Sequence, residues 1–190
     1  TDRLTFFEID PLVVKIAAGD GPFTFVRDCA KGPVDVVIGD ARLTLAQQPD
    51  QTFDLLLIDA FSSDAIPTHL MTVEALRGYL AKLKPDGVLI LHLSNRNLEL
   101  RDIAQAVALE AGGAALIQRH HPPEGVSVLW ESDEDVMIVG HSMQALAPYA
   151  ADPSWRVARR GETRAWTDDY TNVFGALARQ MRERWATVSQ

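Results

Sequence analysis

The sequence predicts an α/β fold in which a mainly parallel β-sheet is flanked by helices. Short apolar or β-branched runs, such as residues 34–38 and 53–58, are typical of strands that are buried on both faces. Segments with a helical spacing of apolar residues separate these runs, as in residues 73–82. Strands that alternate with helices in this rhythm are usually joined by right-handed crossovers, which make neighbouring strands parallel.

The composition indicates one globular domain over residues 1–190. The chain is 47% hydrophobic and 23% charged, which is sufficient for a sizeable core and unlike a disordered or fibrous segment. It contains no run of about 18 apolar residues and no signal-peptide pattern. We therefore expect a soluble, cytoplasmic chain.

The charge balance excludes some partners and favours others. The formal net charge is −8, and lysine and arginine form no stripe, so nucleic acid is not an expected partner. A cationic or neutral small substrate is easier to accommodate. The single cysteine, Cys29, excludes an internal disulfide and a multi-cysteine zinc site.

The first quarter of the chain predicts two strands, each followed by a helix. Asp10 and Pro11 form a typical helix start, with an N-capping side chain followed by proline at the first helical position. Residues 23–30 fit either a short helix or an extended segment. The expected elements are strands at 4–9 and 34–38 and helices at 11–18 and 42–47.

The remainder continues the alternation and then departs from it. Thr72 is a suitable N-cap for a helix, and residues 84–87 read as a turn. The apolar residues of 142–160 show neither a helical nor a strand-like spacing. The expected elements are strands at 53–58, 88–93, 114–118 and 135–139, and helices at 73–82, 98–111 and 171–185.

Three successive strands are predicted to end in acids, namely Glu8, Asp40 and Asp59. Ligands of open α/β sheets bind at the carboxyl ends of the strands, so these three carboxylates are expected to line one crevice. A competing explanation is that acids favour helix N-termini because of the helix dipole, which alone could account for Asp10 and part of Asp40.

Four short motifs resemble those of the polyamine aminopropyltransferases, the spermidine synthase family, in order and approximate spacing. They are Phe7-Glu8-Ile9-Asp10, Ile38-Gly39-Asp40-Ala41, Leu57-Ile58-Asp59-Ala60 and Leu83-Lys84-Pro85-Asp86-Gly87-Val88. The resemblance covers roughly residues 4–93. The cluster at residues 167–170 is similar to one in spermidine-synthase-like domains, some of which are fused to membrane segments. The resemblance implies a Rossmann-like fold, that of the S-adenosylmethionine-dependent methyltransferases.

The resemblance also implies roles for individual residues. Glu8 and the adjoining Ile9 would meet the ribose side of an adenosyl donor, and Asp40 with Ala41 would meet the adenine. Asp59 would bind and deprotonate the attacking amine. Asp64 would be a second catalytic acid, and Asp168 and Tyr170 would close the site over the substrate. The implied co-substrate is decarboxylated S-adenosylmethionine or S-adenosylmethionine itself, with a small polycationic amine as acceptor and no metal.

The sequence departs from the family pattern in two places. The family has a second Asp three residues after the first, whereas position 62 is Ser62 and the next acid is Asp64. The family also has a glycine-rich turn on the strand that precedes the one ending in Glu8, whereas only three residues precede Leu4. We therefore expect an N-terminally truncated domain without its first strand, which binds adenosyl ligands weakly and is itself inactive, although its full-length parent is an enzyme.

Several alternatives stay open at this point. The reaction could be methyl transfer to a small acceptor, or the fold could be a catalytically degenerate ligand-binding module. Asp168 and Tyr170 could simply cap the final helix. His92, at a strand end with Ser94 and Asn95, is more typical of a satisfied histidine than of a catalyst. A homo-oligomer, with late tryptophans such as Trp185 at its interface, and membrane segments in the parent are also left open.

Overall fold

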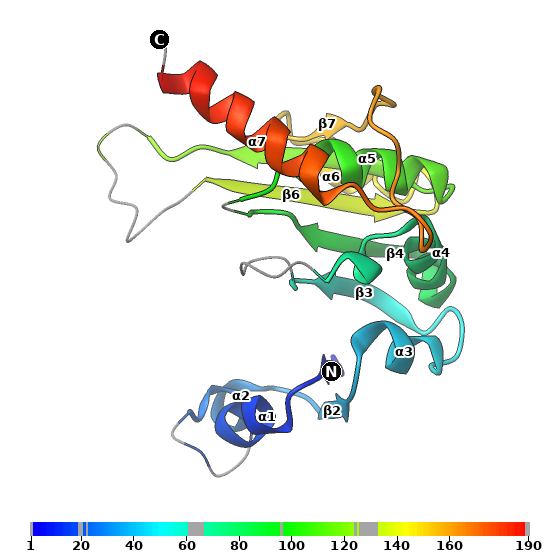
Figure 1. Cartoon of the computed structure of the whole chain (residues 1–190). Coiled ribbons are helices and arrows are strands. Elements are labelled where there is room, and N and C mark those ends of the chain that lie inside the picture. The colour runs from blue at the N-terminus through cyan, green and yellow to red at the C-terminus, as the bar shows by residue number, and fades with distance from the viewer. Residues whose placement is uncertain are drawn as a thin grey trace. The chain divides into compact units, whose positions relative to one another are not determined.

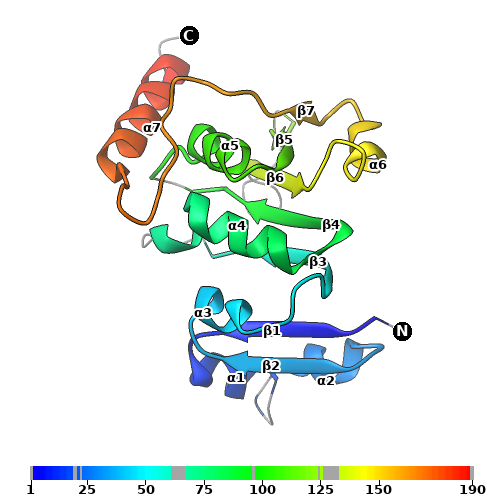
Figure 2. The ribbon, with the colours of Figure 1, turned by 90° about the vertical axis from the view of Figure 1, so that its right-hand side faces the viewer.

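The computed structural model describes residues 2–18, 21, 23–60, 67–95, 97–123, 125 and 133–188. The chain forms two compact units, Thr1–Pro49 (the N-terminal unit) and Asp50–Gln190 (the C-terminal unit). Figures 1 and 2 together label the helices and strands of each. The single domain over residues 1–190 stays a prediction.

The N-terminal unit contains two parallel strands, β1 (Leu4–Glu8) and β2 (Val34–Ile38), which lie side by side in Figure 2. Both strands were predicted within one residue. The helices of this unit are α1 (Pro11–Ala17), α2 (Phe25–Cys29) and α3 (Ala41–Ala46). The ambiguous residues 23–30 thus contain a short helix, and the helix expected at 42–47 begins one residue earlier.

Local capping explains where two of these helices begin. Asp10 accepts a hydrogen bond from the Leu12 backbone N–H at 2.7 Å, and Pro11 occupies the first helical position, as predicted. Asp40 accepts from the Leu43 N–H at 3.1 Å at the start of α3. Each helix therefore starts directly at the carboxyl end of a strand.

The C-terminal unit is built on a five-stranded sheet with the order β3-β4-β6-β5-β7. β3 and β4 are parallel, as predicted, and β6 runs antiparallel to both of its neighbours. β5 therefore points the same way as β4. The strands are β3 (Phe53–Ile58), β4 (Leu83–His92), β5 (Ala114–His120), β6 (Glu134–Gly140) and β7 (Arg156–Val157).

The helices of this unit are η1 (Thr68–Leu70), α4 (Val73–Lys82), α5 (Arg101–Glu110), α6 (Ala147–Ala150) and α7 (Val173–Val188). Thr72 caps α4 by accepting from the Ala75 N–H at 3.2 Å, which confirms the predicted N-cap. α5 begins three residues later than predicted. The chain before it is held by Asn95, whose Oδ1 accepts from the Asn97 and Leu98 N–H groups at 2.9 and 3.0 Å.

The predicted turn at residues 84–87 lies within β4 rather than before it. The register between β3 and β4 shifts here, because Phe53 pairs with Leu83 while Leu55 pairs with Val88. A Cβ atom on Gly87 would come within 2.8 Å of the Phe53 carbonyl oxygen, so the close approach of the two strands requires glycine. The predicted turn was therefore wrong, because these residues form an irregular stretch inside the strand.

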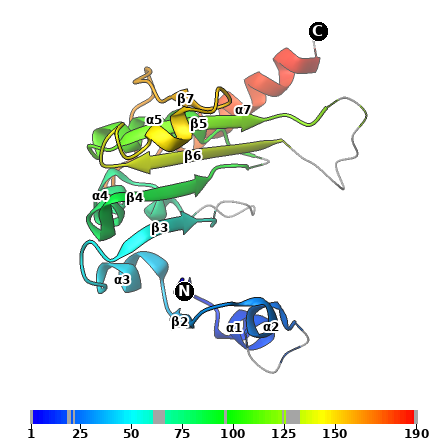
Figure 3. The same cartoon turned by 180° about the vertical axis from the view of Figure 1, so that it is seen from behind.

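Apolar side chains cover both faces of this sheet. Leu89 and Leu91 of β4 pair with Val139 and Met137 of β6, and all four are fully buried. Figures 1 and 3 show α5 and α7 on the same side of the sheet. A second cluster contains Val88, Leu116, Ile138 and Leu146, with Tyr149 and Trp155 packed against it. The sheet is thus the centre of the hydrophobic core.

A network of charged side chains joins α7 to α5. Glu99 is 3% exposed, and its two carboxylate oxygens accept from the Arg101 and Arg179 Nε–H groups at 3.2 and 3.3 Å. Glu99 also accepts from the Asp102 N–H at 3.2 Å, so it stabilises the first turn of α5. Arg101 in turn donates to Glu183 of α7 at 2.6 Å.

The protonation of this network follows from its burial. Burial lowers the pKa of Arg101, but the carboxylates of Asp135, Glu183 and Glu99 more than offset this, and the net pKa is raised. Burial raises the pKa of Asp135, and Arg101 and Arg119 offset this only in part. Arg101 therefore stays charged among these carboxylates.

Glu99→Gln should destabilise the fold by about 1 to 3 kcal/mol, because the amide retains the shape but leaves two partly buried arginines undercompensated. Urea unfolding measures the loss. Glu110→Gln is the matched control, since Glu110 faces the exposed Arg160 at 3.5 Å, and it should change the unfolding free energy by less than about 0.5 kcal/mol. Equal effects of the two substitutions would contradict the role of Glu99.

Candidate functional site

The N-terminal unit brings Glu8 and Asp40 to the same end of its two strands. Glu8 pairs with Ile38 in register, and the Gly39 N–H donates to the Glu8 carbonyl at 2.9 Å. Gly39 has a φ of 142°, and a Cβ atom there would lie 2.9 Å from Cγ2 of Thr44. Only glycine permits this turn from β2 into α3, which positions Asp40.

The other residues predicted to meet the donor lie beside these two acids. The Glu8 Oε1 atom accepts from the Asp10 N–H at 2.9 Å, which fixes the half-buried carboxylate at the start of α1. Ile9 is exposed between them, and Ala41 is the first residue of α3. Glu8, Ile9, Asp40 and Ala41 thus cluster at the carboxyl ends of β1 and β2, where ligands of parallel sheets bind.

The C-terminal unit places Asp59 directly beside His92. Ile58 of β3 pairs with Leu91 of β4, so the next residue of each strand lies at the same carboxyl edge. Nδ1 of His92 lies 2.7 Å from Oδ1 of Asp59. The Asp59 side chain is 55% exposed and that of His92 is 27% exposed. This contact was missed in the sequence, where the two residues are 33 positions apart.

The other residues noted near this edge have different surroundings. Asp64 lies outside the described residues, so its catalytic role stays a prediction. The Ser94 hydroxyl accepts from the Asp135 N–H at 2.9 Å, which ties the end of β4 to the start of β6. Asn95 is occupied in holding the approach to α5. Ser94 and Asn95 therefore have structural contacts that position the edge.

Asp168 docks against the start of α4. Its Oδ1 atom accepts from the Thr72 hydroxyl at 2.8 Å, and its N–H donates to Oε2 of Glu74 at 3.0 Å. The fully buried Trp166 adds a third hydrogen bond to the start of α4, because its carbonyl accepts from the Val73 N–H at 2.9 Å. The chain at residues 166–168 thus forms a clamp on α4, held by one side-chain and two backbone contacts.

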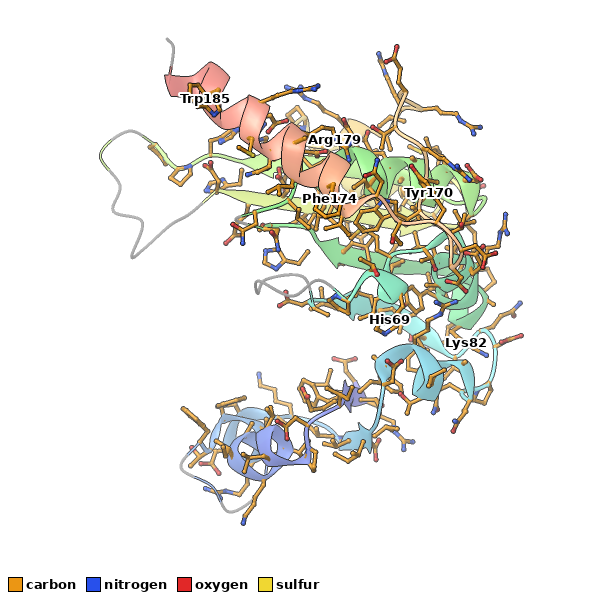
Figure 4. All side chains as sticks on the ribbon, viewed as in Figure 1. His69, Lys82, Tyr170, Phe174, Arg179 and Trp185 are labelled. Atoms are coloured by element: carbon orange, nitrogen blue, oxygen red, sulfur yellow. The ribbon has the colours of Figure 1, made fainter. Side chains whose placement is uncertain are left out.

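Tyr170 belongs to the same loop. Its backbone pairs with that of Thr167, and the Arg164 guanidinium lies over its ring, 3.9 Å from the ring centroid. Such an arrangement is a cation–π contact. Figure 4 shows Tyr170 on the chain that leads into α7.

The structure thus gives each unit one pair of neighbouring polar residues at its strand ends, although His92 was not a predicted site residue. Glu8 lies with Asp40, and Asp59 lies with His92. The prediction that three strand ends line one crevice involves both units, and it stays a prediction. Among the described residues, no group of three or more His, Cys, Asp or Glu side chains could hold a metal ion. Nor does the described part of the chain contain a helix of the length and apolarity needed to cross a membrane.

Asp168→Ala should lower the unfolding free energy by about 1 to 2 kcal/mol, because the buried Thr72 hydroxyl would lose its acceptor. Chemical denaturation measures this. Asp169→Ala, at the exposed neighbouring position, is the control and should be nearly neutral. If Asp168→Ala were as stable as the original chain, the clamp would contribute nothing to the fold.

Comparison with known proteins connects this geometry to a family, although no family model matches the chain. Over 90 residues, 46% of the chain, it is 36% identical to a polyamine aminopropyltransferase of Vibrio vulnificus, and the match covers 28% of that relative. A probable spermidine synthase from Corynebacterium glutamicum aligns with 90% of this chain and 74% of its own, at 13% identity and a TM-score of 0.52. Spermidine synthase from Thermotoga maritima aligns with 91% of this chain and 56% of its own, at 15% identity and a TM-score of 0.51.

The sequence match and the fold agree with each other. The sequence match supports the resemblance to the polyamine aminopropyltransferases, and the two structures share the α/β fold. The Rossmann-like class predicted from the sequence is therefore confirmed, with an antiparallel β6 inserted between β4 and β5. The chain is a relative of the polyamine aminopropyltransferases.

Proposed function

We propose that the chain is a spermidine synthase-like transferase domain, which moves an aminopropyl group from decarboxylated S-adenosylmethionine to an amine. The observation that carries this proposal is the position of Asp59. It is an exposed carboxylate at the carboxyl end of β3, in a chain that is 36% identical over 90 residues to a polyamine aminopropyltransferase. Asp59 binds the amine and takes its proton.

The donor is bound by the acids of the N-terminal unit. Glu8 accepts hydrogen bonds from the ribose hydroxyls, and Ile9, Asp40 and Ala41 complete this part of the site. Carboxylates at the ends of parallel strands suit such contacts, because they accept from two hydroxyls at once. S-adenosylmethionine itself is the alternative donor, and no metal is required by this chemistry.

The acceptor is a small polycationic amine. A net charge of −8 attracts cations, and a carboxylate beside the reacting amine holds its ammonium form. Asp64 assists as a second acid, and Asp168 and Tyr170 border the substrate. The contacts of Asp168 with Thr72 and Glu74 support this placement, because they hold residues 166–170 in a defined arrangement against the start of α4.

The reaction requires little covalent chemistry from the protein. The ammonium loses a proton to Asp59, and the nitrogen lone pair then attacks the carbon bonded to the sulfonium sulfur. The carbon–sulfur bond breaks, and its electron pair stays on sulfur as a neutral thioether. The chain's own contribution is to bind the amine, remove its proton and orient it.

A homo-oligomer is a further element of the proposal. α7 exposes Phe174 and Trp185, labelled near its two ends in Figure 4, with Leu177 and Met181 between them. Apolar side chains at this spacing form one stripe along a helix, which suits contact with a second copy. We also propose a cytoplasmic location and membrane segments in the parent protein, in keeping with the membrane-fused relatives of the family.

In the full-length protein, Asp59→Asn should abolish aminopropyl transfer, a loss of at least about 100-fold, because the amide cannot take the proton. Donor binding, measured by calorimetry, should be preserved. Asp54→Asn is the control, since Asp54 lies on the same strand and faces Lys84 at the surface. Undiminished transfer by Asp59→Asn would reject the assigned role, and a methylated product would favour the methyltransferase alternative.

The 190-residue chain alone should bind methylthioadenosine weakly or not at all, because the glycine-rich wall expected from the family is not among its motifs. Calorimetry of the chain and of the full-length protein, side by side, measures the difference. Micromolar affinity of the chain itself would contradict the expectation that its donor site is incomplete.

A further inference from the structure

His92 is the last residue of β4, and both its backbone and its ring have a defined partner. Its backbone pairs with Val136 of β6, and its Nδ1 atom contacts Asp59 at 2.7 Å. The next residue, Leu93, donates its N–H to the Asp135 carbonyl at 2.8 Å. The strand end that carries His92 is therefore fixed, and its imidazole is held against Asp59 through Nδ1.

A histidine in contact with a carboxylate through Nδ1 has a characteristic chemistry. When Nδ1 carries the proton, it donates to the carboxylate, and the opposite nitrogen, Nε2, has a lone pair that can accept a proton. The carboxylate then stabilises the imidazolium that forms. An imidazole is also a stronger base than a carboxylate. This difference is relevant because an ammonium group has a high pKa, so a stronger base removes its proton more readily.

We propose that Asp59 and His92 act as a pair in which His92 receives the proton of the acceptor amine. The inference rests on the proposed function and changes one part of it, because the pair and not the carboxylate alone is the base. It makes His92 a catalytic residue, a role that the sequence did not predict. Asp59 retains two tasks, since it holds the ammonium and stabilises the charged imidazole.

The proton and electrons balance in this step. One N–H bond of the ammonium breaks, its proton bonds to Nε2 of His92, and its electron pair stays on nitrogen. That pair forms the new bond to the carbon of the sulfonium donor, and the carbon–sulfur pair leaves on sulfur. His92 afterwards returns its proton to water. No oxidant, reductant or metal is needed.

Two substitutions separate this role from a positioning role. In His92→Asn the side-chain amide can still donate to Asp59 from near the place of Nδ1, but it cannot accept the proton. Transfer by the full-length protein should fall at least about 100-fold. His121→Asn is the matched control, because Nδ1 of His121 also faces an aspartate, Asp133, at 3.0 Å. It should leave transfer unchanged.

Nuclear magnetic resonance of the histidine nitrogens provides a readout that does not depend on turnover. The chain has five histidines, and the signal that disappears in His92→Asn belongs to His92. Addition of 1,4-diaminobutane should shift the Nε2 signal of His92, and Asp59→Asn should abolish this shift. The signal of His121 should not respond.

The outcomes distinguish the two proposals. Transfer within threefold of the original level in His92→Asn would overturn the pair while the proposed function stood. Absence of any amine product from the original protein would reject the proposed function. In that case, a diamine-dependent shift of His92 that is lost in Asp59→Asn would still support the pair as an amine-binding site. A His92 signal unaffected by the diamine would overturn it.

Discussion

The parallel pairing of β3 and β4 is the constraint on which the candidate amine site depends. Parallel strands in register end at the same edge, so the residue after Ile58 and the residue after Leu91 become neighbours. The contact between Asp59 and His92 follows from that register and not from any local motif. A slip of one residue would turn one of the two side chains to the other face of the sheet.

The antiparallel β6 secures the edge that this pairing creates. It lies between β4 and β5, and its first residues bind the end of β4 through the Ser94 hydroxyl and the Leu93 N–H. The pairing of β3 with β4 ends at Ile58 and Leu91. The hydrogen bonds from Asp135 of β6 reach Leu93 and Ser94, which lie just beyond that point. The polar edge is thus held by the Ser94 side chain and by backbone contacts, while the Asp59 side chain stays 55% exposed.

Local chemistry could be predicted from the sequence, and long-range contacts could not. The caps at Asp10 and Thr72 were correct because each involves residues two or three positions apart. The start of α5 was wrong by three residues. Glu99, which accepts from the Asp102 N–H there, is buried against Arg179, 80 positions away, and that burial has no local signal. The prediction of the fold class was nevertheless correct, because it depends on the order of apolar runs and not on where each helix begins. The pairing of Asp59 with His92 has no comparable local signal.

Glu99 and Asp59 have different surroundings in the fold, and this difference supports the choice of Asp59 for the candidate site. Glu99 is buried between two arginines, and both of its carboxylate oxygens are used by contacts within the fold. Asp59 is exposed, and its partner is an imidazole, a group that can gain or lose a proton near neutral pH. A carboxylate held by arginine is a structural element, whereas a carboxylate beside histidine can take part in proton transfer. A carboxylate therefore serves stability at Glu99, just before α5, whereas the carboxylate of Asp59 at the end of β3 is the one that we propose serves chemistry.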